Sequence, residues 1–415
     1  MVITMNERVY KQLKQANDML NNQYEAIDRV ALKNKEKVLD AFNAHQLSES
    51  DLNGTSGYGY DDIGRDKLES IYAEIFNAED AFARYSLVSG THAIYTALNG
   101  LLNYGDELMY ITGDPYDTLH EVIGISGHSE VSFIQRGMNY QSIDLLNDKI
   151  DVEKVIHSIN SSTKVIAIQR SRGYSSRPSI TIKEIEACIQ RIKSQYPDVI
   201  IFVDNCYGEF VEEQEPTDVG ADIVAGSLIK NLGAGIAEMG GYIVGRESLI
   251  QRISETFISP GIGKEVGASL NQLKDMYLGL FLAPSVVKNS LKGAILIAYI
   301  MEQYGYKSYP KSNAERTDIV QAIQFDDKER LIEFCQYVQR YSPVNSHVTP
   351  VPSELPGYSS EVIMAAGTFT QGSSIELSAD APIKSPYIAY IQGGLTFEHV
   401  ELFVMRLIER YNKIR

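Results

Sequence analysis

Cysteine is scarce in this sequence. The 415 residues include three cysteines, Cys188, Cys206 and Cys335, with no Cys-x-x-Cys spacing and no histidine partner nearby. A sparse, odd count is typical of a reducing compartment, where thiols behave as small hydrophobic side chains. We therefore expect neither a disulfide framework nor a thiolate metal site.

Excess positive charge and long apolar runs are also missing. The formal net charge is -16, which argues against a nucleic-acid or anionic-membrane partner. No apolar run reaches the roughly 18 residues that span a bilayer. The first residues, MVITMNERVYKQ, soon become charged and contain no apolar signal region. These features predict a cytoplasmic protein with no nucleic-acid or membrane partner.

Several well-known functional motifs are absent. The stretch GIGKEVG at 261–267 lacks the upstream glycine and the Ser/Thr of a P-loop, and Gly233 and Gly235 lack the third glycine of G-x-G-x-x-G. The sequence contains no G-x-S-x-G. Its seven histidines are scattered without metal-ligand spacing, so no metal is expected.

What is present is an alternation of short apolar runs and amphipathic helical patterns. Hydrophobic residues make up 44% of the chain, which is enough for a large core. Because helices separate apolar runs, the pattern predicts an α/β fold: a mostly parallel seven-stranded sheet with helices on both faces. The predicted strands are 85–88, 107–111, 131–134, 164–169, 199–204, 222–227 and 241–245.

The remaining segments suggest how the chain is divided. Residues 7–45 have a helical pattern, and from about Pro284 a long helix leads into a smaller α+β segment. We therefore predict an N-terminal helical segment and arm over 1–60, a cofactor-binding α/β domain over 61–285, and a C-terminal α+β domain over 286–415.

Reactive side chains follow the predicted strands. Ser89, Gly90 and Thr91 open a helix, Tyr116 lies in GDPYD, and Asp204 ends a strand. Ligand sites in open parallel sheets lie beyond the carboxyl ends of the strands, so these loops should meet. Each residue also has a purely structural explanation: a helix cap, a turn aromatic or a capping carboxylate.

The same edge receives positive charge. Arg170, Arg172 and Arg177 follow one strand and are either an anion site or a solvated face. Lys230 lies in AGSLIKNLGAG and has no charged neighbour between Asp222 and Glu238. A lysine buried among apolar groups is expected to have a depressed pKa and to serve as nucleophile and base, unless its amine simply reaches solvent.

One cofactor uses all of these features. Pyridoxal 5'-phosphate needs a lysine for its Schiff base, a carboxylate at its ring nitrogen, an aromatic side chain on its ring face and a helix N-terminus for its phosphate. Its protonated ring withdraws electrons from the α carbon of an amino acid. The strand-end residues therefore predict pyridoxal phosphate.

The motifs resemble those of fold-type I pyridoxal-phosphate enzymes of cysteine and methionine metabolism. The sequence is most similar to the methionine gamma-lyase-like or cystathionine beta-lyase-like group labelled aluminium resistance proteins. The similarity covers nearly the whole chain and rests on these stretches: GYGYDDIGRD, GDPYDTLHEVIG, QRSRGYSSRPS, VDNCYGEF, GSLIKN, IELSADAPIKSPY and YIQGGLTFEH.

The resemblance implies a role for each matching residue. Lys230 would hold the cofactor aldehyde, Asp204 the ring nitrogen and Tyr116 the ring face. The phosphate contacts implied within the chain are Ser89, Gly90, Thr91 and Ser227. Tyr58 and Arg65 would reach the cofactor phosphate of a neighbouring subunit, which implies a homodimer at least and a homotetramer as the expected assembly.

The sequence differs from the family pattern at several positions, chiefly where the family contacts its substrate. Ile229 replaces the threonine that precedes the family's lysine, and Arg170-Ser171-Arg172-Gly173 replaces its Pro-x-Asn-Pro segment. The family's C-terminal arginine for the substrate carboxylate has no clear counterpart. Arg172, Arg170 and Lys384 are the candidates for that contact.

The expected reaction is beta- or gamma-elimination on a sulfur-containing amino acid, giving a thiol, ammonia and a keto acid. Two other functions remain open from the sequence. One is an aminotransferase or decarboxylase on the same fold, and the other is a cofactor-binding regulatory protein without turnover. The substrate is expected to be a small amino acid in each enzymatic case.

Overall fold

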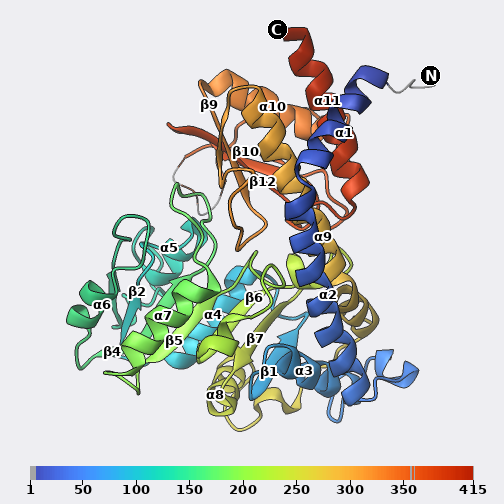
Figure 1. Ribbon diagram of the computed structural model, residues 1–415. Coiled ribbons are helices and arrows are strands. Elements are labelled where there is room, and N and C mark those ends of the chain that lie inside the picture. The colour runs from blue at the N-terminus through green and yellow to red at the C-terminus, as the bar shows by residue number, and fades with distance from the viewer. Residues whose placement is uncertain (1–5, 356–357, 359, 415) are drawn as a thin grey trace.

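The computed structural model describes residues 6–355, 358 and 360–414, which form two units joined by long helices (Figure 1). The larger unit contains the strands β1 (Asp80–Arg84), β2 (Glu107–Tyr110), β3 (Asn139–Ser142), β4 (Thr163–Gln169), β5 (Ile200–Asp204), β6 (Ile223–Ser227) and β7 (Gly241–Gly245). Its helices are α3 (Ile63–Ile75), α4 (Gly90–Leu101), α5 (Asp117–Ile123), α6 (Val152–Ser158), α7 (Ile182–Lys193) and α8 (Glu247–Phe257).

The smaller unit lies above the larger one in Figure 1. Its elements are β8 (Lys307–Tyr309), β9 (Gln321–Phe325), α10 (Lys328–Arg340), β10 (Val362–Ala365), β11 (Ser378–Pro382), β12 (Tyr387–Gln392) and α11 (Phe397–Ile414). The helices α2 (Asn21–Ala44) and α9 (Leu273–Gln303) extend along both units, and α1 (Glu7–Met19) packs against α11 of the smaller unit.

The larger sheet has the order β1-β7-β6-β5-β4-β2-β3. Only β7 runs antiparallel to its neighbours β1 and β6 among the described strands of this sheet; the other pairs are parallel. The prediction of a mostly parallel seven-stranded sheet is therefore confirmed. The five-stranded sheet, β10-β11-β12-β9-β8, is antiparallel.

Alternating side chains of each strand face opposite helix layers. In β4, Val165 and Ala167 pack with α4, α5 and α8, whereas Ile166 and Ile168 pack with α3, α6, α7 and α9. Both faces are covered, which explains why these strands are apolar throughout.

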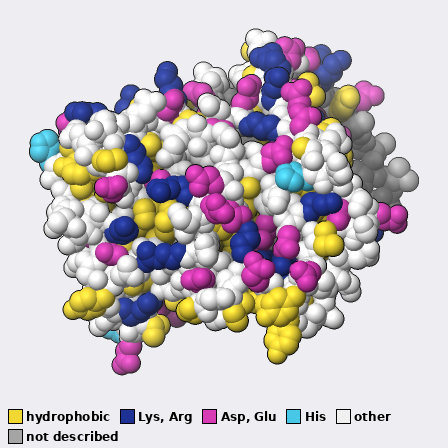
Figure 2. All heavy atoms as spheres, turned by 90° about the horizontal axis from the view of Figure 1, so that it is seen from below, with side chains coloured by type: hydrophobic (Ala, Val, Ile, Leu, Met, Phe, Trp, Pro, Cys, Tyr) yellow, Lys and Arg dark blue, Asp and Glu magenta, His cyan; other side chains and the backbone are white. Residues whose placement is uncertain are grey.

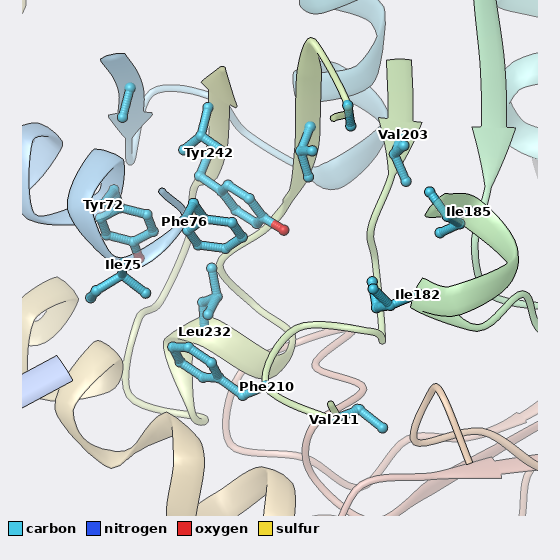
Figure 3. Packing of buried hydrophobic residues seen from close by; sticks show 14 of the residues in the cluster. Tyr72, Ile75, Phe76, Ile182, Ile185, Val203, Phe210, Val211, Leu232 and Tyr242 are labelled. Carbon is cyan, nitrogen blue, oxygen red and sulfur yellow. The ribbon is translucent and has the colours of Figure 1, made fainter. Parts of the chain in front are cut away.

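Aromatic rings fill the second face where α3 meets the sheet. Figure 3 shows Tyr72 and Phe76 beside Tyr242 of β7, with ring centroids 6.0 and 5.2 Å from that ring. This packing anchors β7 against α3, and the Tyr242 hydroxyl donates a hydrogen bond to Glu209 in the turn after β5.

Five of the seven predicted strands are confirmed, and two predictions are wrong. Residues 85–88 form the turn that follows β1, and residues 131–134 lie in turns before β3. Phe133 lies in a turn but is buried in the core. An apolar run in the sequence does not distinguish such a turn from a strand. The true β3, Asn-Tyr-Gln-Ser, is a partly exposed edge strand and therefore lacks the apolar pattern.

Helix α9 starts earlier than the sequence suggested and contains Pro284 in its interior. It is long and apolar enough to cross a membrane by length and composition alone, but 67% of its most apolar window is buried inside the protein. That burial is typical of a core helix. The boundary predicted between residues 285 and 286 falls within α9, which packs against both α2 and α11.

Candidate active site

The carboxyl ends of β4, β5 and β6 meet at one edge of the sheet. Gln169 pairs with Asp204, and Asp204 pairs with Ala225, two residues before the end of β6. A cavity of about 190 Å³ opens at this edge. The structure brings seven predicted cofactor contacts into its wall: Ser89, Gly90, Thr91, Tyr116, Asp204, Ser227 and Lys230.

The first turn of α4 forms one end of the cavity. The Ser89 hydroxyl accepts a hydrogen bond from the backbone N–H of His92 at 3.1 Å, which caps the helix. A Cβ placed on Gly90 would lie 3.1 Å from the Cβ of Ser227, so glycine allows the helix start and the end of β6 to approach closely. The first backbone N–H groups of a helix have no intrahelical partners and attract anions. This cradle fits a phosphate.

Lys230 reaches the cavity from the turn after β6. Its Nζ lies 3.5 Å from the centroid of the Tyr207 ring. Tyr207 has φ = 73°, a left-handed conformation that is uncommon for a tyrosine and is found at functional sites more often than elsewhere. The turn after β5 therefore holds an aromatic face against the amine.

The expected depressed pKa of Lys230 is not what the surroundings produce. Burial lowers the pKa of the Lys230 amine, but Tyr207, Cys206 and Asp204 favour the ammonium form and raise the pKa above its usual value. The positive charge of Lys230 is thus stabilised by its neighbours. The apolar sequence context concealed the polar neighbours that the turn after β5 supplies.

Two buried carboxyl groups lie near this amine. Burial raises the pKa of Asp204, while the N–H of Cys206, at 3.1 Å from Oδ1, and the charge of Lys230 act in the opposite direction. Burial raises the pKa of Glu209 to about 8, although Tyr242 donates a hydrogen bond to it at 2.9 Å. Glu209 is therefore mostly protonated at neutral pH, and of these two groups only Asp204 lines the cavity.

Tyr116 covers the side of the cavity formed by the loop after β2. Its backbone N–H donates to Gln169 Oε1 at 2.6 Å, and its hydroxyl lies 2.5 Å from the hydroxyl of Tyr358. Its ring also contacts Tyr174 edge-on, with centroids 5.2 Å apart. Burial raises the pKa of the Tyr116 phenol well above its usual value, so the phenol keeps its proton.

The residues predicted to bind substrate lie elsewhere. Arg170 is fully buried and donates to Asn205, Gly208 and Glu212, so it holds the loop after β5 in place and we no longer assign it a substrate contact. Lys384 is exposed in the turn between β11 and β12 and does not line the cavity. Arg172 does not line it either, although its neighbours Ser171 and Gly173 do.

Tyr58 and Arg65 are also outside the cavity of their own chain. Tyr58 is 80% exposed, whereas Arg65 is buried and donates to the carbonyl oxygens of Gly59 and Gly267 at 2.7 and 3.0 Å. Arg65 thus fixes the loop that presents Tyr58. A direct contact from Arg65 to another subunit would require these hydrogen bonds to break.

Sequence reasoning missed several residues of the wall. Thr118 shares a hydrogen bond with Thr91 at 3.0 Å, Gln169 positions Tyr116, and Tyr207 lies against Lys230. Gln169 and Tyr207 could have been found, because both lie at or just beyond strand ends. Thr118 could not, since nothing in its local sequence separates it from an ordinary helix residue.

Known proteins are similar to this chain over most of its length. The methionine gamma-lyase family model matches residues 9–412. The chain belongs to this family. A Bacillus subtilis protein of uncharacterised function, YnbB, is 53% identical over 380 residues, which cover 91% of this chain and 90% of the relative.

Solved structures show the same fold. A carbon-sulfur lyase involved in aluminium resistance from Clostridium novyi is 46% identical, with a TM-score of 0.93, covering 98% of this chain and 96% of that one. A Listeria monocytogenes protein, described as a candidate cystathionine beta-lyase involved in aluminium resistance, is 47% identical with a TM-score of 0.94, covering 97% and 99% of the two chains.

A more distantly related structure is similar to this chain in fold alone. The pyridoxal-phosphate-dependent YhfS of Escherichia coli is 17% identical, with a TM-score of 0.61, over 94% of this chain and 97% of that one. The chain therefore has the fold of fold-type I pyridoxal-phosphate enzymes. Membership of the methionine gamma-lyase family implies pyridoxal phosphate as the cofactor.

Proposed function

We propose that this protein is a pyridoxal-phosphate-dependent carbon-sulfur lyase. It would catalyse beta- or gamma-elimination on a sulfur-containing amino acid such as cystathionine, cysteine or methionine, releasing a thiol, ammonia and a keto acid. The observation that carries the proposal is the meeting of Lys230, Asp204 and the α4 N-terminus in one cavity. The test is the release of thiol, ammonia and keto acid by the purified, cofactor-loaded protein.

The residues present fit the cofactor. Lys230 would bind its aldehyde carbon, Asp204 would face its ring nitrogen, and Tyr116 would cover its ring. Gly90 and Thr91 would hold the phosphate through backbone N–H groups, with the hydroxyls of Ser89 and Ser227 nearby. When bound, the cofactor stabilises negative charge at the α carbon of the amino acid.

The chain's own groups would then move the protons. Lys230 Nζ would take the proton from the substrate α carbon as a general base. Tyr116 holds its phenolic proton because burial raises the pKa of this group, so it is a suitable donor to the departing sulfur. The rings of Tyr116, Tyr174 and Tyr358 contact one another, and this cluster would limit access of water to the cavity.

We further propose a cytoplasmic enzyme that works as a homodimer at least, with a tetramer as the expected assembly. Tyr58, Tyr60 and Ile63 are all exposed on one loop and the helix it leads into. Figure 2 shows charges of both signs on the lower face of the molecule, with hydrophobic side chains gathered at several places among them. The exposed aromatics favour a contact with a second copy, in which Tyr58 would reach the partner's cofactor phosphate.

This arrangement predicts rescue by mixing chains. Lys230→Ala chains and Tyr58→Ala chains should each be inactive alone, because one lacks the amine and the other the partner's phosphate contact. Their mixture should regain activity, since a hybrid dimer retains one site with both residues. The keto-acid assay measures the recovery. A mixture that stays inactive while labelled subunits exchange would exclude the shared site.

A further inference from the structure

An aromatic ring lies directly against the amine of Lys230 in the wall of the cavity. Lys230 Nζ is 3.5 Å from the centroid of the Tyr207 ring, well within the distance of about 6 Å at which a cation is attracted to a ring face. Of the neighbours that favour the ammonium form, Tyr207 acts most strongly, ahead of Cys206 and Asp204. Burial raises the pKa of the Cys206 thiol well above its usual value, so this thiol keeps its proton and brings no charge.

Both units of the protein hold the Tyr207 ring in this place. The residue has a left-handed backbone conformation, with φ = 73°, which favours glycine or asparagine over a bulky side chain. Its carbonyl oxygen accepts a hydrogen bond from the N–H of Ile319 at 3.2 Å, and its ring packs against the cluster of the smaller unit that contains Ala322 and Tyr390. The position of the ring beside Lys230, and not the turn itself, accounts for a tyrosine in this conformation.

The carboxyl groups around the amine serve it less constantly than the ring does. Those that experience the charge of Lys230 are Asp204, Glu209 and Asp380. Glu209 is mostly protonated, Asp204 would face the ring nitrogen of the bound cofactor, and Asp380 belongs to β11 of the smaller unit. A ring face, unlike a carboxylate, does not gain or lose a proton. The attraction of Tyr207 for the ammonium group therefore persists as the pH changes.

We propose that the ring face of Tyr207 holds the ammonium group that Lys230 acquires when it takes the α proton of the substrate. The inference rests on the proposed function and makes Tyr207 a positioning residue. In this step the C–H bond breaks, its proton goes to Lys230 Nζ, and its electron pair passes to the cofactor. The amine thereby gains a positive charge, and a ring face 3.5 Å away stabilises that charge.

The proposal predicts opposite effects on two processes when the ring is removed. The cofactor-free protein captures pyridoxal phosphate through the unprotonated amine, which becomes more abundant when the ammonium form loses its support. Capture at neutral pH should therefore become faster. Proton transfer from the substrate should become slower, because the ammonium group that it produces is less stable. A side chain that merely supported the fold would slow both processes when it is removed.

The first measurement is the rate at which the cofactor-free protein captures pyridoxal phosphate, followed by absorbance across a pH series. In Tyr207→Leu the curve should move to lower pH by about 0.5–1.5 units, so that capture at neutral pH is about 3- to 30-fold faster than in the wild type. Tyr207→Phe retains the ring face and should retain the wild-type curve. Tyr104→Leu removes an exposed tyrosine and is the matched control.

The second measurement is exchange of the α hydrogen of L-alanine for deuterium by the cofactor-loaded protein. Alanine has no leaving group, so this exchange does not depend on elimination. In Tyr207→Leu exchange should be about 2- to 10-fold slower at alkaline pH, and the acid limb of its pH profile should move to lower pH. A fluorinated phenylalanine at position 207 keeps the shape of the ring but weakens its face, and should give a smaller change of the same sign.

The outcomes separate the role of Tyr207 from the proposed lyase function. Slower capture together with slower exchange in Tyr207→Leu would show a structural role and overturn the proposal. So would a Tyr207→Phe protein that behaves like Tyr207→Leu, because the hydroxyl would then be the important group. If the ring dependence of capture and exchange is found but no sulfur-containing amino acid releases a thiol, the role of Tyr207 stands and the lyase function is refuted. A wild type that captures the cofactor but never exchanges the α hydrogen would refute both.

Discussion

Replacing Lys230 with alanine is expected to abolish both turnover and the borohydride-reducible bond between the protein and pyridoxal phosphate. Lys230 Nζ is the amine that the turn after β6 brings into the cavity with Asp204 and the start of α4. No water molecule can replace an amine that first binds the cofactor and then accepts a proton from carbon. The loss should therefore be complete within the sensitivity of the assay.

The measurement is reduction of the cofactor-loaded protein with borohydride, followed by peptide mapping of the modified lysine. Lys274→Ala removes an exposed lysine from the first turn of α9 and should retain both the adduct and turnover. If Lys230→Ala still formed the reducible adduct, another lysine would hold the cofactor and the assignment of the cavity would be wrong.

The second large effect is expected for Asp204→Asn, which should lower turnover by about 10²-fold or more. Asp204 is buried at the end of β5, and in the proposed mechanism its negative charge would keep the cofactor's ring nitrogen protonated. A neutral amide keeps the hydrogen bond from the Cys206 N–H but cannot supply that charge. The cofactor itself should remain bound, because Lys230 and the phosphate contacts are unchanged.

In Asp204→Asn, turnover should therefore fall while the cofactor content stays at the wild-type level. Absorbance gives the cofactor content, and the keto-acid assay gives turnover. Asp198→Asn, an exposed aspartate just before β5, is the matched control and should behave as the wild type. Turnover close to that of the wild type in Asp204→Asn would remove this carboxylate from the mechanism.

The central sheet and the cavity could be predicted because both follow local rules. Strands such as β4 and β5 are buried on both faces, so their sequences are continuously apolar and easily recognised. The reactive residues then follow from the rule that ligands bind beyond the carboxyl ends of parallel strands. Lys230 was conspicuous because a charged side chain among small and apolar residues is unusual unless it is reactive or reaches solvent.

The residues that the sequence did not reveal depend on contacts between distant segments. Arg170 looked like Arg172 in sequence, yet its guanidinium is used by Asn205, Gly208 and Glu212, more than 30 residues away. The pKa of Lys230 likewise depends on side chains from another segment, Tyr207 and Asp204.

The most direct test of the carbon-sulfur lyase proposal is product analysis with the purified, cofactor-loaded protein. Cystathionine, cysteine and methionine are supplied separately, and thiol or sulfide, ammonia and keto acid are each quantified over many turnovers. The proposal predicts that at least one substrate gives all three products in equal amounts. Stoichiometric conversion of the cofactor to pyridoxamine phosphate without thiol release would indicate transamination instead. Release of carbon dioxide would indicate decarboxylation, and an absorbance change without any product would contradict an enzymatic role.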